Sequence, residues 1–278
     1  MSGSGSVSGI IPRAVDKMVQ EVISLRESGW QIKLKASILE VYNESIRDIL
    51  TSSSGDGLLG ETNVSENKAS AKHRITFSNG KVSVSDMSSV EIDTSTLEGG
   101  RRCLDEILSR SQKNRTTAST AMNERSSRSH CLFYLDISGY HAGVNTYMEG
   151  GLRLVDLAGS ERLGRAGTSG DSSRFRETVS INKSLSTLGE VFLALSNKAP
   201  HVPYRNSKLT MLLQVSSRLH RSHYIHHYPI LSSLLQDCLS GDGKALMFVN
   251  VSPTMASLQE TVCSLRFANQ VRCCSRVL

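Results

Sequence analysis

The chain has 278 residues, 38% of them hydrophobic, but no apolar run near the roughly 20 residues that cross a bilayer, so we expect no membrane-spanning segment. A net charge of +6 and a pI near 9.1 predict an acidic partner, while an aromatic content of 5% without aromatic residues between basic ones disfavours nucleic acid. Six cysteines without Cys-x-x-Cys spacing and a Ser/Gly-rich start without a signal peptide favour reduced thiols in cytoplasm or nucleus.

Helical and strand-like segments alternate along the first third of the chain. Apolar residues at helical spacing follow Pro12 and predict a helix over residues 13–27. Alternation around Ala36 predicts a strand, and residues 42–50 are interpreted as a short helix. Residues 51–98 are rich in Ser and Gly and contain two weak strands near 73–77 and 81–84, which predicts a peripheral hairpin lobe.

The next third continues the α/β pattern. We expect a helix over residues 98–112 and strands over 131–137 and 151–156, the last ending in Asp156 before a glycine turn. Ligands of open α/β sheets bind beyond the carboxyl ends of the strands, which places Asp156 where chemistry occurs. A further helix beginning near Thr178 is predicted to pack through Val179, Leu185, Leu188, Phe192 and Leu195.

Two segments have the composition of a nucleotide switch. We define them as the first switch segment, residues 123–130 (Asn-Glu-Arg-Ser-Ser-Arg-Ser-His), and the second switch segment, residues 156–161 (Asp-Leu-Ala-Gly-Ser-Glu). The hydroxyls of Ser126 and Ser127 can ligate Mg²⁺ or bind a γ-phosphate, and Asp156 can hold the metal through water, because hard cations prefer oxygen ligands. Gly159 offers an unobstructed backbone N–H, and Asn123 belongs to the same candidate nucleotide site.

Three further segments, residues 40–48, 181–185 and 201–210, accompany the switches in a fixed order. With them the chain resembles a kinesin motor domain, and most closely the C-terminal, minus-end-directed kinesins. The resemblance implies one α/β domain over residues 1–278 with the kinesin-type P-loop NTPase fold, a central mixed sheet flanked by helices. It also implies ATP and Mg²⁺ as cofactors, microtubules as partner, and a cytoplasmic, cytoskeletal location that includes the spindle.

The resemblance assigns roles to single residues. Arg128 and Glu161 would form the salt bridge that closes the switches around the nucleotide and positions the attacking water; the alternative is a surface ion pair of little energetic value. Lys183, Arg205 and Lys208 would meet the acidic microtubule surface, and the loop over residues 162–176 would add further contacts, whereas isolated basic residues are more often solvated charges. The loop residues assigned to the microtubule are Arg174 and Arg176.

The chain departs from the family at its start. No Gly-x-x-x-x-Gly-Lys-Ser/Thr loop occurs in the sequence, and Met1 falls where the family's phosphate loop has just ended. We therefore expect the first strands and the phosphate loop to be missing, and this chain alone not to hydrolyse ATP. Residues 246–251 correspond to a family strand that lies between two earlier strands, so we expect unpaired edges and a tendency to aggregate.

A second departure is the block over residues 215–236, which has no counterpart in the family. Introns begin with GT and end with AG, as valine codons begin and one glutamine codon ends. A block from Val215 to Gln236 is therefore consistent with a short retained intron that is translated in frame. The alternative is a genuine loop insertion. Three functions remain open from the sequence. They are a motor that hydrolyses ATP in its complete form, a microtubule-binding fragment indifferent to nucleotide, and a product without function.

Overall fold

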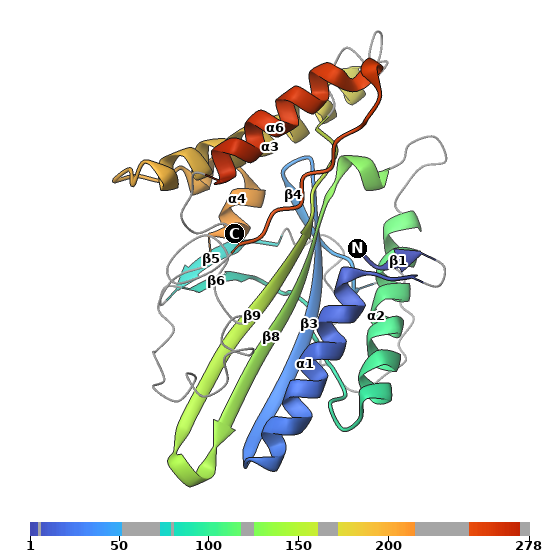
Figure 1. Cartoon of the computed structure of the whole chain (residues 1–278), viewed down its shortest axis with the longest axis vertical. Coiled ribbons are helices and arrows are strands. Elements are labelled where there is room, and N and C mark those ends of the chain that lie inside the picture. Colours follow the sequence, from blue (N-terminus) through green and yellow to red (C-terminus); the bar gives the residue numbers. More distant parts are fainter. Residues whose placement is uncertain are drawn as a thin grey trace.

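The computed structural model describes residues 1–4, 7–51, 73–78, 81–117, 125–160, 172–214 and 245–272. Its centre is a five-stranded sheet in the order β4-β3-β8-β9, with β7 also beside β3 (Figure 1). Apolar side chains cover both faces of this sheet, so helices pack on each side. The strands of the sheet are β3 (Trp30–Tyr42), β4 (Ser45–Asp48), β7 (Val90–Glu91), β8 (His130–His141) and β9 (Thr146–Asp156).

Two helices form the layer on one face of the sheet. Helix α1 (Ile10–Glu27) confirms the expected helix and begins three residues earlier, and α2 (Leu97–Thr117) extends the expected helix to Thr117. The two helices pack against each other, and α1 also packs against β3 (Figure 1). The contact exists because α1 repeats apolar residues every three or four positions. Its buried residues are Ile11, Val15, Met18, Val19, Val22 and Leu25.

The opposite layer contains α3 (Ser172–Ser196), α4 (Lys208–Leu213) and α6 (Leu258–Arg272). Helices α3 and α6 lie side by side beyond one end of the long strands (Figure 1), with the rings of Phe192 and Phe267 edge to face. Successive side chains of β8 point to opposite faces of the sheet, so alternate residues pack against the two helix layers. Phe133 and Leu135 join the core beneath α1, and Leu132 and Tyr134 join the core beneath α3.

The interpretation of residues 42–50 as a helix is wrong. Strand β3 instead turns back into β4, and Tyr42 pairs with Ser45 across a two-residue turn. Asn43 and Glu44 both have positive φ, 47° and 55°, which is the backbone of the tight turns that match the twist of a hairpin. The backbone of residues 45–48 therefore pairs with the edge of β3 and not within a helix.

The two strands expected within residues 51–98 are present, while residues 52–72 and 79–80 lie outside the described part of the chain, so the extent of the lobe stays a prediction. Strands β5 (Ile75–Ser78) and β6 (Lys81–Val84) pair as an antiparallel hairpin in a separate two-stranded sheet. The shorter elements are the pair β1 (Gly3–Ser4) and β2 (Val7–Ser8), and the single turns η1 (Arg125–Arg128), η2 (Ala142–Val144), η4 (Tyr204–Asn206) and η6 (Met255–Ser257). Among the helices that the structure describes, none is long and apolar enough to cross a membrane.

Residues 246–251 do not join the central sheet. The pairings of that sheet are antiparallel throughout its described strands, whereas the sequence predicts a mixed sheet in which these residues form a strand. Leu246 and Phe248 are 64% and 67% exposed. The segment thus presents several apolar side chains to solvent.

Candidate functional site

The two switch segments meet at one end of the sheet. The first switch segment runs into β8 through η1, and the second follows β9, the neighbouring strand, in which Asp156 pairs with Cys131. The backbone N–H of Gly159 donates to the carbonyl of Ser127 across 2.8 Å. Two residues that are 32 positions apart in the sequence, one from each switch segment, are therefore joined by a direct hydrogen bond.

The site offers oxygen atoms that suit Mg²⁺. Ser127 and Asp156 are both exposed there, one from η1 and one from the end of β9. A hydroxyl, a carboxylate and water are the ligands Mg²⁺ uses beside phosphates, so these residues fit the metal of a nucleotide complex. The lysine and glycine loop that would hold the phosphates themselves is not in the sequence. Asn123, Glu161 and the side chain of Ser126 lie outside the described residues.

Arg128 contacts a carboxylate that the sequence analysis did not assign. Its Nη1 lies 3.3 Å from Oε2 of Glu177, a buried residue in the first half of α3. The expected partner, Glu161, lies outside the described residues, so that pairing stays a prediction. The Arg128–Glu177 pair connects the first switch segment directly to α3.

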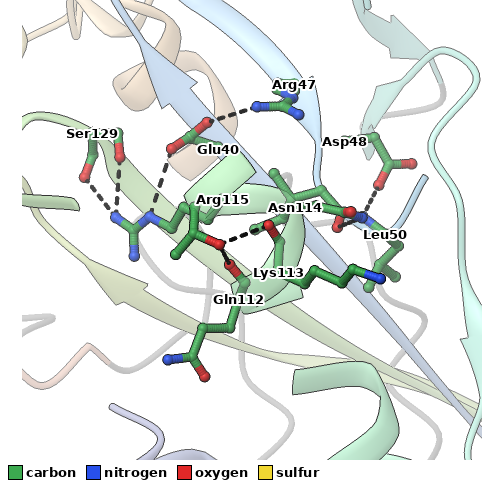
Figure 2. A network of polar contacts seen from close by, with 11 residues as sticks. Glu40, Arg47, Asp48, Leu50, Gln112, Lys113, Asn114, Arg115 and Ser129 are labelled. Carbon is green, nitrogen blue, oxygen red and sulfur yellow. Dashed lines mark hydrogen bonds and ion pairs between the residues drawn. The ribbon is translucent and has the colours of Figure 1, made fainter. Parts of the chain in front are cut away.

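A buried charge network supports the first switch segment from below (Figure 2). The carboxylate of Glu40, in β3, is fully buried and lies between Arg47 of β4, at 4.0 Å, and Arg115 of α2, at 3.6 Å. Arg115 in turn donates from Nη2 to the hydroxyl of Ser129 at 3.0 Å and to its carbonyl at 3.3 Å. The sheet, α2 and the end of the first switch segment are thereby held to one another.

His130, the last residue of the first switch segment, is buried and bonded through both ring nitrogens. Its Nδ1 accepts from the backbone N–H of Ala158 at 3.0 Å, and its Nε2 lies 2.8 Å from the hydroxyl of Ser184 in α3. Burial lowers the pKa of His130 to about 4, so the ring is neutral at pH 7. Burial likewise raises the pKa of the neighbouring Cys131 thiol to about 11, which keeps it protonated and unreactive.

The pKa of His130 predicts an acid-sensitive contribution to stability. A histidine in the unfolded chain binds a proton near pH 6.5 and the folded one near 4, so its contribution is complete above 6.5 and is lost as the pH falls toward 4. Between pH 7 and 5 the free energy of unfolding should fall by about 2 kcal/mol more in the parent than in His130→Gln. Urea unfolding at both pH values measures this, with the exposed His201→Gln as control; equal pH dependence in parent and His130→Gln would contradict it.

The basic residues assigned to the microtubule lie on neighbouring elements. Lys183 is exposed on α3, Arg205 is exposed on η4 with its guanidinium over the ring of Phe77, and Lys208 is half-buried at the start of α4. Elements η4 and α4 both pack against α3. The structure thus brings three residues from two separate motifs onto one connected layer.

Two expectations around α3 need correction. The helix begins at Ser172, six residues before the predicted start, so Arg174 and Arg176 belong to it and not to a loop. Arg176 is exposed, while the side chain of Arg174 lies outside the described part of the chain. Val179, predicted to pack, is 43% exposed, whereas Leu188 and Phe192 are buried as expected.

Comparison with known proteins agrees with this geometry. The family model described as kinesin motor domain matches residues 1–222 and 218–274. Kinesin-like protein KIN-14M of Arabidopsis thaliana is 41% identical over 272 residues, covering 98% of this chain and 32% of that protein. The motor domain of the kinesin-like protein Kar3 of Saccharomyces cerevisiae superimposes with a TM-score of 0.69 at 37% identity, covering 95% of this chain and 68% of that one. A KIF14 dimer with AMP-PNP in complex with a microtubule gives a TM-score of 0.73 at 31% identity, covering 99% and 67%.

The chain belongs to the kinesin motor-domain family, and its similarity is to the C-terminal kinesins, as the sequence predicts. The fold class is confirmed by the same structural matches. The chain spans about a third of the length of the curated relative it matches and about two thirds of the two solved motor structures.

Proposed function

We propose that this chain is the switch-bearing and microtubule-binding part of a kinesin-like motor domain, which in its complete form couples ATP hydrolysis to movement along microtubules. The polypeptide of residues 1–278 taken by itself binds microtubules without hydrolysing ATP. Its place in the cell is then the microtubule cytoskeleton of the cytoplasm or spindle. The hydrogen bond from Gly159 to Ser127 is the observation that carries the proposal, because it joins the two switch segments directly.

The nucleotide half of the proposal depends on Ser127 and Asp156. Both side chains are exposed at the end of the sheet where the switch segments meet, so a Mg²⁺–phosphate group can approach both. The Gly159 amide donates to the carbonyl of Ser127 in this structure and would have to leave it to donate to a phosphate. Mg²⁺, when bound, neutralises phosphate charge and orients the γ-phosphate. Arg128 and Glu161 are proposed to close the site, and Arg128 would exchange its present partner, Glu177, for Glu161 as they do so. The absence of a phosphate loop from the sequence supports the lack of hydrolysis by these 278 residues alone.

The microtubule half depends on charge. Lys183, Arg205 and Lys208, together with Arg174 and Arg176, place positive charge on α3 and on the elements packed against it. A chain with net charge +6 is attracted by an acidic polymer, and that attraction is screened by salt. The structural relative bound to a microtubule supports the choice of polymer.

Co-sedimentation with microtubules tests both halves together. We expect binding that weakens as salt increases and that does not change when ATP and Mg²⁺ are added. Release by ATP would show that the chain couples nucleotide to binding and would overturn the proposed lack of ATPase function. Failure to sediment with microtubules at low salt would overturn the microtubule half.

Charge reversal on α3 and η4 tests the assigned surface. The double variant Lys183→Glu/Arg205→Glu should bind microtubules about tenfold to a hundredfold more weakly at low salt, since each reversal replaces an attraction of about 0.5 kcal/mol by a similar repulsion. The measurement is the dissociation constant from co-sedimentation. Arg102→Glu/Lys113→Glu is the control, because it changes the net charge by the same amount and both residues are exposed on α2 in the opposite layer. Equal losses in both variants would mean that binding depends on net charge and not on this surface.

A further inference from the structure

His130 forms a continuous hydrogen-bond chain between the second switch segment and α3. The hydrogen positions follow from the partners. The amide of Ala158 can only donate, so Nδ1 of His130 carries no proton, and the neutral ring then donates from Nε2 to Ser184. The hydroxyl of Ser184 donates its hydrogen bond to the carbonyl of Ile181, 2.7 Å away. Each group in this series of hydrogen bonds is therefore fixed as a donor or an acceptor by its neighbour.

The two ends of this hydrogen-bond series lie beside groups with proposed functions. Ala158 directly precedes Gly159, whose amide bonds to the first switch segment. Ser184 directly follows Lys183, which is exposed on α3. His130, Ala158 and Ser184 are 3%, 5% and 2% exposed, so water does not compete for these hydrogen bonds. A rigid imidazole ring holds its two nitrogens at a fixed separation, and a displacement at one end must therefore break a bond or move the other end.

We propose that His130 is a positioning residue that couples the backbone of the second switch segment to the microtubule-facing helix α3 through its two ring nitrogens. The inference deepens the proposed function and depends on it for the identity of the microtubule. The coupling itself is a property of the folded chain. A buried histidine with a purely structural role would hold its neighbours in place but would not transmit a change from α3 to Ala158.

The first test needs no microtubule. Ser184→Ala removes the bond on the α3 side, and amide exchange of the full chain then reports on Ala158. We expect exchange at Ala158 to accelerate about five- to tenfold, the effect of weakening one buried hydrogen bond. Ser111→Ala is the matched control, since Ser111 is also a buried serine whose hydroxyl donates to a carbonyl three residues earlier in its own helix, that of Leu108 on α2, and takes no part in the hydrogen bonds of His130. An unchanged rate at Ala158 in Ser184→Ala would overturn the inference.

The second test separates coupling from stability. Binding of microtubules should slow exchange at Ala158 severalfold in the parent chain and in Ser111→Ala. His130→Asn keeps an acceptor for Ala158 but cannot reach Ser184, so it should still bind microtubules yet lose the effect at Ala158. His130→Gln, whose longer amide reaches toward Ser184 but not toward Ala158, should also lose it. If the effect persists in both variants, the inference is wrong.

Failure of the proposed function has a different signature. If the parent chain does not bind microtubules, the microtubule proposal fails, while accelerated exchange at Ala158 in Ser184→Ala still upholds the coupling. If the parent binds microtubules but Ser184→Ala leaves Ala158 unchanged, the coupling fails and the microtubule proposal stands.

Discussion

A polypeptide of residues 1–278 is expected to self-associate in solution, and the double variant Leu246→Ser/Phe248→Ser is expected to return most of it to the monomer. The reason is the C-terminal apolar segment, residues 246–258, whose large apolar side chains are unusually exposed. Their burial between copies stabilises an associated state by about 2 kcal/mol for each large side chain. The exposed members are Leu246, Phe248, Val251, Met255 and Leu258.

Size-exclusion chromatography with light scattering measures this association. Tyr147→Ser is the control, because Tyr147 is 69% exposed but belongs to β9 near its turn with β8, at the other end of the sheet from α6 (Figure 1). The control should elute like the parent. A sharp cooperative melt together with a monomeric elution profile for the unmodified polypeptide would contradict the prediction.

Glu40→Gln is expected to lower the free energy of unfolding by about 2–3 kcal/mol. Glutamine has nearly the same shape, so the loss comes from leaving the guanidinium groups of Arg47 and Arg115 near each other without an anion between them (Figure 2). The expected loss is below that of a fully buried pair because the two arginine side chains are 28% and 19% exposed.

Urea unfolding at low protein concentration measures the Glu40→Gln effect. The chain supplies a matched control in the pair of Glu98 and Arg102 on α2, which is 3.8 Å apart and more than three-quarters exposed at both side chains. Glu98→Gln should change stability by about 0.5 kcal/mol or less. Similar losses in the two variants would mean that Glu40 contributes no more than a surface charge.

Periodic segments could be predicted from the sequence because one face of each is buried. The apolar repeat of α1 and the alternation around Ala36 in β3 gave the right element within a few residues. The prediction of a helix over residues 42–50 was wrong because β4 is only four residues long and is defined by its pairing with β3, not by a sequence pattern of its own. The predicted start of α3 was wrong for a similar reason, since the first turn of the helix carries no apolar repeat.

The arrangement of the switch segments could be predicted only in part. Motif composition singled out Ser127, Asp156 and Gly159; the structure joins Ser127 to Gly159 by a hydrogen bond and ends β9 at Asp156, and their role at a nucleotide stays a prediction. Glu177 and Ser184 were missed as partners because each meets the first switch segment through tertiary packing of α3. His130 belonged to the quoted motif, and its only signal was a histidine at the first position of a buried strand.

The register of the central strands has a consequence for how the chain folds. β8 and β9 are joined by a short turn, and so are β3 and β4, so each hairpin can form from local contacts. The β3–β8 ladder instead joins Trp30 to His141 and closes a loop that contains the peripheral lobe and α2. Because the entropy of closing a long loop rises only with the logarithm of its length, lengthening the lobe should slow folding very little. The connection after β4 is accordingly a place where this architecture can accept extra residues at small kinetic cost.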